Sequence, residues 1–192
     1  MSVPVRSISI FNIQYSHLSL NVHVQVWCGV LGTGPDGTSL NSSYNTRNDP
    51  KYLAALGQIV IMFLKIVPKG VLLFFPSYGL LNSTRDHWQQ SGIWSRIDAI
   101  KKIVVEPQRK DALSSTMNEY YDEIRSGRGA CFMAVCRGKV AEGLDFANDN
   151  GRAVLITGLP YPPYKDARVE LKRQFLDDQL RTKSGASMTG IL

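Results

Sequence analysis

The chain of 192 residues is 44% hydrophobic and 20% charged, the composition of an ordinary globular protein rather than of a disordered chain or a coiled coil. This length allows one domain with a substantial core and is too short for two large ones. The 22 lysines and arginines against 16 acidic residues give a net charge of +6, which fits a polyanionic partner but is also common in proteins that bind none.

The first predicted elements are a strand at residues 24–31, a polar glycine-rich loop, and a helix at 48–67. The helix begins with a capping Asn or Asp and carries Pro50 in its first turn, where proline is well tolerated. A second strand is predicted at 70–75, and its continuous apolar run is typical of a strand covered on both faces. One face of the predicted helix collects apolar residues at helical spacing: Leu53, Leu56, Val60, Phe63, Leu64 and Val67.

Short apolar runs continue to alternate with longer amphipathic ones after Pro76. The helix that follows this proline has Leu80, Leu81, Thr84 and Trp88 on one side. The remaining predicted elements are a helical segment at 93–102, a strand at 102–107, a helix at about 112–125, strands at 130–136 and 152–158, and a charged helix at 166–180.

Five strands and about four helices in the order βαβαβαββα predict a single α/β domain, with an open and mainly parallel sheet of RecA-like or Rossmann-like type flanked by helices. Such sheets bind their ligands outside the carboxyl ends of the strands. The loops that start at Pro76, Glu106, Arg137 and Leu159 are therefore the candidate sites.

The segment GTGPDG at 32–37 has the spacing of a dinucleotide-binding loop, but we interpret it as a surface turn. A dinucleotide site requires a helix that opens at the third glycine, whereas Pro35 and a polar stretch intervene here. No Walker A run, G-x-x-x-x-G-K-[ST], occurs in the sequence. Any ATP chemistry would need a phosphate cradle from another polypeptide segment.

The segment FFPSY at 74–78 places Ser77 and Tyr78 at the carboxyl end of a strand. Hydroxyl and backbone N–H groups at this point can bind a phosphate oxygen, as in many sequence-neutral contacts to nucleic acids. An N-capping serine with a packed tyrosine explains the same residues equally well. Both interpretations remain open.

The segment CRGKVAEGLDF at 136–146 combines charges of both signs with two glycines at the end of another strand. Glycine permits close backbone approach or a positive φ, and the charged side chains can bind phosphate, ribose hydroxyls or one another. A solvated loop and a nucleotide site are both compatible with this composition. The residues concerned are Arg137, Gly138, Lys139, Glu142, Gly143 and Asp145.

Neither a metal site nor a membrane segment is predicted. The three cysteines lie in apolar runs outside any metal-binding spacing, so we expect small buried side chains in a reducing compartment. The longest apolar run, 59–67, is about half the length that crosses a bilayer and contains Lys65. The N-terminus has no secretory signal pattern, so we expect an intracellular protein.

Four segments in this order resemble the second helicase domain of the xeroderma pigmentosum group D-like branch of superfamily 2 DNA helicases. They are GVLLFFPSY, VEPQ, AVCRGKVAEGLDFANDNGRAVLITGLPYPP and DARVELKRQFLDD. The resemblance covers residues 24–182 and implies a RecA-like domain of the P-loop NTPase type, between a divergent N-terminal segment at 1–23 and a tail at 183–192.

The resemblance also implies roles for individual residues. FFPSY corresponds to helicase motif IV, whose Ser77 and Tyr78 would face single-stranded or forked DNA together with Lys139 of motif V. RGKVAEGLDF corresponds to motif V, which lies between two RecA-like domains and couples the nucleotide to the DNA. Its coupling residues would be Arg137, Gly138 and Gly143, with Glu142 and Asp145 as catalytic carboxylates.

Other parts of such an enzyme have no counterpart in this sequence. The family carries its Walker lysine, its DEAH acid and its four iron–sulfur cysteines in the first domain, and an arginine finger near the end of the second. We therefore expect ATP, Mg²⁺ and the iron–sulfur cluster to belong to a complete nuclear enzyme of DNA repair or telomere maintenance, and the 192-residue chain to be inactive alone. The alternative is a non-catalytic RecA-like module that modulates a full-length helicase; the flanking coding sequence would distinguish the two.

Overall fold

The structure is a computed structural model that describes residues 28–136, 138, 146–161 and 166–184. It divides into two compact units, Met1–Leu159 and Pro160–Leu192. The domain boundaries predicted from the sequence, at residues 23 and 182, remain predictions.

A parallel sheet forms the centre of the first unit. Its described strands are β1 (Gly70–Phe75), β2 (Lys102–Val105), β3 (Ala130–Val135) and β4 (Ala153–Ile156). They are arranged in the order β2-β3-β1-β4, and every pairing among them is parallel. The predicted α/β fold with a mainly parallel sheet is therefore confirmed.

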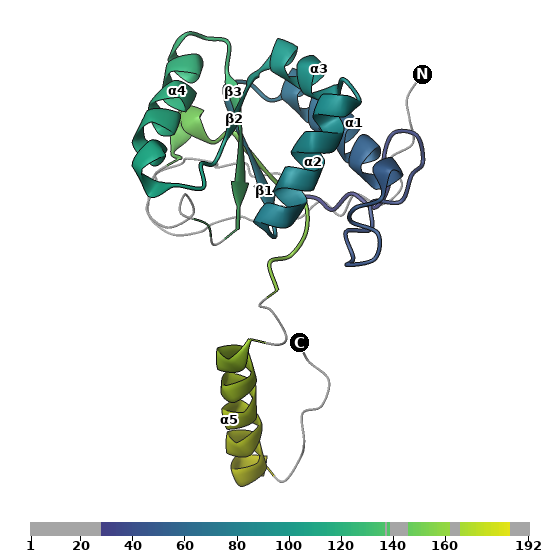
Figure 1. Ribbon diagram of the computed structural model, residues 1–192, viewed down its shortest axis with the longest axis vertical. Helices are drawn as coiled ribbons and strands as arrows, with labels where there is room; N and C mark the ends of the chain where they lie inside the picture. Colours follow the sequence, from purple (N-terminus) through teal and green to yellow (C-terminus); the bar gives the residue numbers. More distant parts are fainter. Residues whose placement is uncertain (1–27, 137, 139–145, 162–165, 185–192) are drawn as a thin grey trace, which may run out of the picture. The chain divides into compact units, whose positions relative to one another are not determined.

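Helices cover both faces of this sheet. Figure 1 shows α1 (Pro50–Ile66), α2 (Tyr78–Gln90) and α3 (Ile93–Ile100) on one side and α4 (Leu113–Arg125) on the other. Two short 3₁₀ turns, Lys110–Ala112 and Asn148–Asn150, precede α4 and β4. None of the described helices is long and apolar enough to cross a membrane.

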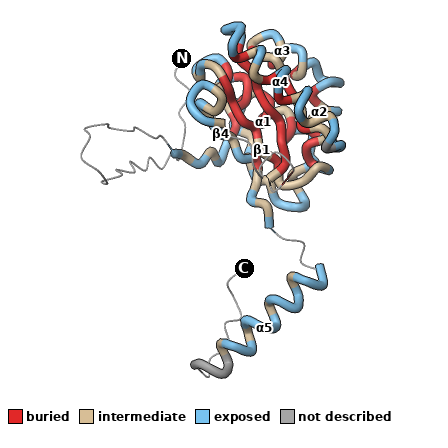
Figure 2. The backbone as a smooth tube through the Cα atoms, turned by 90° about the vertical axis from the view of Figure 1, so that its left-hand side faces the viewer, coloured by how far each residue is buried: buried red, intermediate tan, exposed pale blue. Residues whose placement is uncertain are grey.

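The larger core lies between the sheet and α1–α3, and appears as the buried centre of Figure 2. Because side chains alternate along a strand, Val71 and Leu73 of β1 enter this core while Leu72 enters the opposite one. The indole of Trp88 is fully buried, and its Nε1–H donates to the carbonyl oxygen of Leu53 at 2.8 Å. This hydrogen bond ties α2 to α1.

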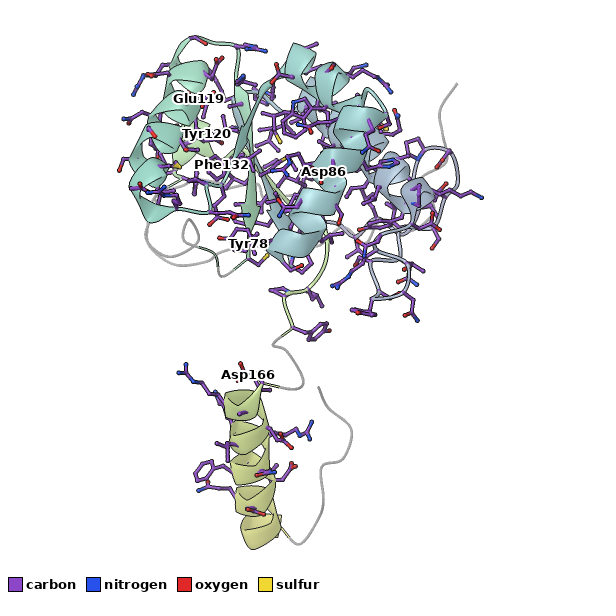
Figure 3. The ribbon with its side chains drawn as sticks, in the orientation of Figure 1. Tyr78, Asp86, Glu119, Tyr120, Phe132 and Asp166 are labelled. Carbon is purple, nitrogen blue, oxygen red and sulfur yellow. The ribbon has the colours of Figure 1, made fainter. Side chains whose placement is uncertain are left out.

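A second core lies between the sheet and α4. Tyr120 of α4 packs edge-on against Phe132 of β3, with ring centroids 5.3 Å apart, and both rings are labelled in Figure 3. The Tyr120 hydroxyl donates to the carbonyl oxygen of Asn150 at 2.7 Å, and burial raises the pKa of this tyrosine well above its usual range. The hydrogen bond links α4 to the segment that leads into β4.

Two sequence-based predictions about the N-terminal part are wrong. Residues 28–31 do not form a strand, and residues 24–27 of that predicted strand lie outside the described residues. The chain instead folds back, with an antiparallel bridge between Thr33 and Ser39, because the glycines and Pro35 favour a turn. Cys28 is exposed and Cys136 is half-buried, contrary to the expectation, whereas Cys131 is buried as expected.

The second unit contains α5 (Ala167–Ser184), which confirms the helix predicted at 166–180. Its first turn is capped by Asp166, whose Oδ1 accepts a hydrogen bond from the Arg168 N–H at 2.8 Å. Leu171 and Phe175 are exposed on this helix, in agreement with its charged composition and with the pale colour of α5 in Figure 2.

Candidate functional site at the carboxyl edge of the sheet

Three of the parallel strands bring residues of the candidate loops to one edge of the first unit. Ser77 and Tyr78 follow β1, Glu106 follows β2, and Gly138 follows β3. Because parallel strands end at the same edge of a sheet, residues far apart in the sequence meet here. Figure 3 shows Tyr78 at this end of the sheet.

Ser77 connects β1 to α2. Its backbone is extended, with φ −159° and ψ 156°, and its Oγ accepts a hydrogen bond from the Leu80 N–H at 3.3 Å. The N-cap interpretation of this serine is therefore confirmed. Phosphate binding is compatible with the same geometry, since the capping oxygen still has its own O–H to donate.

Glu106 is the residue at this edge whose importance the motifs did not reveal. Its side chain is buried, although it ends in a carboxyl group. Oε2 accepts a hydrogen bond from the backbone N–H of Val135 at 2.8 Å, and Oε1 accepts one from the Tyr78 hydroxyl at 3.2 Å. The carboxylate thus joins the ends of β2 and β3 to the first residue of α2.

Gly138 lies directly against this carboxylate. A Cβ at position 138 would come within 2.6 Å of the Oε1 atom of Glu106 and 2.7 Å of the carbonyl oxygen of Val135. The predicted close backbone approach at this glycine is therefore present, and the neighbour is a buried carboxylate. Any larger residue at 138 would displace the end of β3 or the Glu106 side chain.

The other predicted site residues cannot be placed. Arg137 and the segment 139–145, which contains Lys139, Glu142, Gly143 and Asp145, lie outside the described residues. Of the residues predicted from the sequence, the structure brings Ser77, Tyr78 and Gly138 to one edge.

The segment before α1 reaches the same edge. Since α1 leads into β1 through a short turn, it runs opposite to the strands and begins at their carboxyl ends. The hydroxyl of Tyr52 in its first turn donates to the carbonyl oxygen of Thr157, just beyond β4, at 3.2 Å, and burial raises the pKa of Tyr52. A Cβ on Gly158 would lie 3.1 Å from the Oγ of Ser42 and 3.6 Å from Pro76.

The GTGPDG segment is a turn, as predicted. Gly37 has a φ of +83°, which favours glycine, and the Gly34 N–H donates to the carbonyl oxygen of Thr38 at 2.7 Å. The backbone N–H of Thr38 also donates to the carboxylate of Asp36, and this lowers the pKa of Asp36. The turn leads into a loop and then α1, so the helix that a dinucleotide fingerprint needs at its third glycine is missing.

The parallel sheet, its two helical layers and the polar strand ends define an α/β domain of the kind that binds ligands at the carboxyl edge. The helicase C-terminal domain family matches residues 60–189, more than half of the sequence, and the chain belongs to this family. The family predicted from the motifs is confirmed.

Two curated relatives agree with this assignment. The regulator of telomere elongation helicase 1 homolog of Drosophila willistoni is 55% identical over 166 residues, which cover 86% of this chain and 16% of that protein. The homolog of Aedes aegypti is 54% identical over 168 residues, with the same shares of both chains. A solved structure entitled XPD helicase matches with a TM-score of 0.48 at 21% identity, over 71% of this chain and 22% of that one.

The chain thus spans 16% of the length of these curated relatives. Within the helicase branch, the segments 34–57 and 156–178 predict the telomere-elongation type, and SGIWSRI at 91–97 with VELKRQ at 169–174 make the Fanconi anaemia group J type the second candidate. Both relatives carry the telomere-elongation name.

Proposed function

We propose that this chain is part of the second motor domain of an ATP-dependent DNA helicase and that the carboxyl edge of its sheet contacts single-stranded DNA. Membership of the helicase C-terminal domain family supports the first statement. The observation that carries the second is the N-terminus of α2, which opens at this edge beside Ser77.

The start of α2 is suited to a phosphate group. The first backbone N–H groups of a helix have no partner within the helix, and the helix dipole favours an anion there. Gly79 is exposed, and the nearest atom to a Cβ at this position would be the Oγ of Ser77 at 3.8 Å, so the backbone is accessible. A phosphate could accept hydrogen bonds from the Ser77 hydroxyl and from this first turn.

The remaining roles follow the motif resemblance. We propose Ser77, Tyr78 and Lys139 as DNA contacts. We propose Arg137, Gly138 and Gly143 as residues that couple the nucleotide to the DNA, with Glu142 and Asp145 as the catalytic carboxylates.

ATP and Mg²⁺ are expected in the complete enzyme, but the 192-residue sequence contains no Walker A run to hold the nucleotide phosphates. The space next to Gly138 is filled by the carboxyl group of Glu106, so a phosphate has no room at this point. We therefore assign no step of ATP hydrolysis to the described residues and expect the chain alone to lack this activity.

An iron–sulfur cluster is likewise expected only in other parts of the complete enzyme. Cys131 lies inside the core and burial raises the pKa of its thiol to about 12, which disfavours the thiolate that a cluster needs. The described residues contain no group of three or more potential metal ligands.

The biological setting is inferred from the relatives. Their telomere-elongation name supports a role in telomere maintenance or DNA repair, and hence a location in the nucleus. The first helicase domain would be the physical partner of this one, with forked or single-stranded DNA as the substrate.

The DNA contact can be tested by fluorescence anisotropy with the purified 192-residue chain and a labelled oligothymidylate. We expect weak binding that is lost as salt is added, because phosphate contacts release counterions. Ser77→Asp keeps an N-cap but adds a negative charge, and should weaken binding several-fold. Ser77→Asn, the matched control, keeps the cap without the charge and should lose less affinity for the oligothymidylate.

Two results would contradict the proposal. If no binding were detected even at low ionic strength, the edge would not contact DNA without its partner domain. If the chain alone showed DNA-stimulated ATP hydrolysis that was lost in Glu142→Gln or Asp145→Asn, the expectation of an inactive part would be wrong.

A further inference from the structure

The loop between the GTGPDG turn and α1 presents an arginine stacked on an exposed tyrosine. The Cζ of Arg47 lies 4.7 Å from the centre of the Tyr44 ring, and Tyr44 is 80% exposed. Since an aromatic ring has two faces and Arg47 occupies one of them, most of the other remains open to a ligand.

Local hydrogen bonds hold this loop in shape. The side chain of Asn41 accepts a hydrogen bond from the Ser43 N–H at 3.0 Å, and the Arg47 N–H donates to the carbonyl oxygen of Ser43 at 2.9 Å. The Thr46 hydroxyl donates to the carbonyl oxygen of Asn41. These hydrogen bonds connect the backbone segments that carry Tyr44 and Arg47.

Contacts among the described residues do not account for the pair. Among the described residues, no carboxylate lies within ion-pair distance of Arg47, and its buried Nε has no hydrogen-bond partner. An arginine normally uses its planar fork to bind carboxylate or phosphate groups. The large exposed fraction of Tyr44 means that its ring adds little to the core.

The position of the pair relates it to the proposed DNA contact. The loop ends at Asp49, which caps α1, and α1 begins at the carboxyl edge of the sheet. At that edge Ser42 lies against Gly158, and Gly158 in turn approaches Pro76, next to Ser77. The first unit therefore holds the loop and the start of α2 along the same edge.

We propose that Tyr44 and Arg47 bind one nucleotide unit, with its base stacked on the open face of the Tyr44 ring and its phosphate paired with the Arg47 guanidinium. Stacking on aromatic rings tolerates every base, which suits a protein that moves along DNA without reading its sequence. The proposal deepens the proposed function by adding a second contact to the one at Ser77. The same chemistry could be supplied by a DNA strand or by a free nucleotide.

The test compares two ligands on the purified 192-residue chain. Anisotropy is measured with a fluorescein-labelled oligothymidylate about 15 nucleotides long, and separately with a fluorescent ATP analogue. Tyr44→Ala should weaken oligothymidylate binding about ten-fold, and Tyr44→Phe, which keeps the ring, should retain most of the affinity. Arg47→Ala should weaken binding and reduce the slope of the logarithmic salt dependence by about one.

Arg125→Ala is the matched charge control. Arg125 pairs with Asp122 at the end of α4, which lies before the start of β3 and so on the amino edge of the sheet. Its removal changes the net charge as much as Arg47→Ala does, and it should affect binding much less. An equal effect would mean that Arg47 acts only through the overall charge, and would overturn the proposal.

The remaining outcomes are distinct. A loss confined to the oligothymidylate supports the pair as a contact for a DNA strand, and a loss confined to the ATP analogue supports it as a contact for a free nucleotide. If the wild-type chain binds oligothymidylate and both alanine variants bind either ligand as well as it does, this inference fails while the proposed function stands. If the wild-type chain binds neither ligand at low salt, both fail.

Discussion

Replacing Glu106 by alanine is expected to lower the free energy of unfolding by about 2 kcal/mol, even though the residue is an acid rather than an apolar core residue. The change would leave the buried N–H of Val135 without its partner and remove the acceptor of the Tyr78 hydroxyl. An unsatisfied buried donor costs about 1–3 kcal/mol, and a lost hydrogen bond to a charged group costs a similar amount. Removing a buried carboxylate also removes its own desolvation penalty, which keeps the expected sum low.

Conservative variants separate the contribution of the hydrogen bonds to stability from the contribution of the side chain's shape. Glu106→Gln keeps an acceptor for the Val135 N–H and can donate its amide to the Tyr78 oxygen, so we expect a loss of about 1 kcal/mol. Tyr78→Phe should cost about as much, and the double variant should cost less than the sum, because the two side chains share one hydrogen bond.

These changes in the free energy of unfolding are measured by urea denaturation, with tryptophan fluorescence as the signal. The control is Glu119→Ala on α4, where a carboxylate that is 52% exposed lies 3.9 Å from Lys102. Such an exposed ion pair should contribute about 0.5 kcal/mol or less. If Glu106→Ala were no more destabilising than Glu119→Ala, the role of Glu106 in joining the strand ends would be refuted.

Gly57→Ala is expected to destabilise the protein by about 1–3 kcal/mol, because the added Cβ would approach the indole nitrogen of Trp88 to 3.0 Å. A urea midpoint equal to that of the wild type would contradict this packing. In the double variant Cys28→Ser, Cys136→Ser, the buried thiol of Cys131 should react with a thiol reagent only after denaturation, because its pKa is raised to about 12. Fast labelling of the native double variant would instead show that the Cys131 thiol is accessible. The folded state holds the proton of Cys131 more tightly than the unfolded state does, so stability should not depend on this thiol below about pH 9.0 and should fall as the pH rises towards about 12. If the stability of Cys131→Ala fell in the same way at alkaline pH, the fall would come from other titratable groups.

Local sequence patterns predicted the elements whose burial depends on spacing within one segment. The face of α2 formed by Leu80, Leu81, Thr84 and Trp88 is the buried face, because helical periodicity alone determines which of its side chains point inward. The continuous apolar run of β1 likewise matches a strand covered by helices on both faces.

The failures concern features that depend on distant partners. The apolar residues 28–31 looked like a strand, but a strand needs a neighbour to pair with, and this segment instead leads into a glycine-rich turn. The role of Glu106 was not predicted from the sequence because partners such as Tyr78 and Val135 lie 28 and 29 positions away. Only the sheet topology brings these three residues together.

Finding which of the two edges of the sheet binds DNA is the most direct test of the proposed DNA contact, because both edges carry basic residues. Lys102 and Arg128 at the amino edge line a depression of about 390 Å³, but both form ion pairs with acidic side chains such as Asp98. Arg47 at the carboxyl edge has no such pair among the residues whose positions are described. The two edges therefore make different predictions for a bound DNA strand.

The measurement is a titration of the ¹⁵N-labelled 192-residue chain with oligothymidylate, in which the chemical shift of each backbone amide is recorded. We predict that the largest changes cluster at Tyr44, Arg47 and the first turn of α2 from Ser77 to Leu80. Changes centred instead on Lys102 and Arg128 would place the DNA at the opposite edge and contradict the central claim.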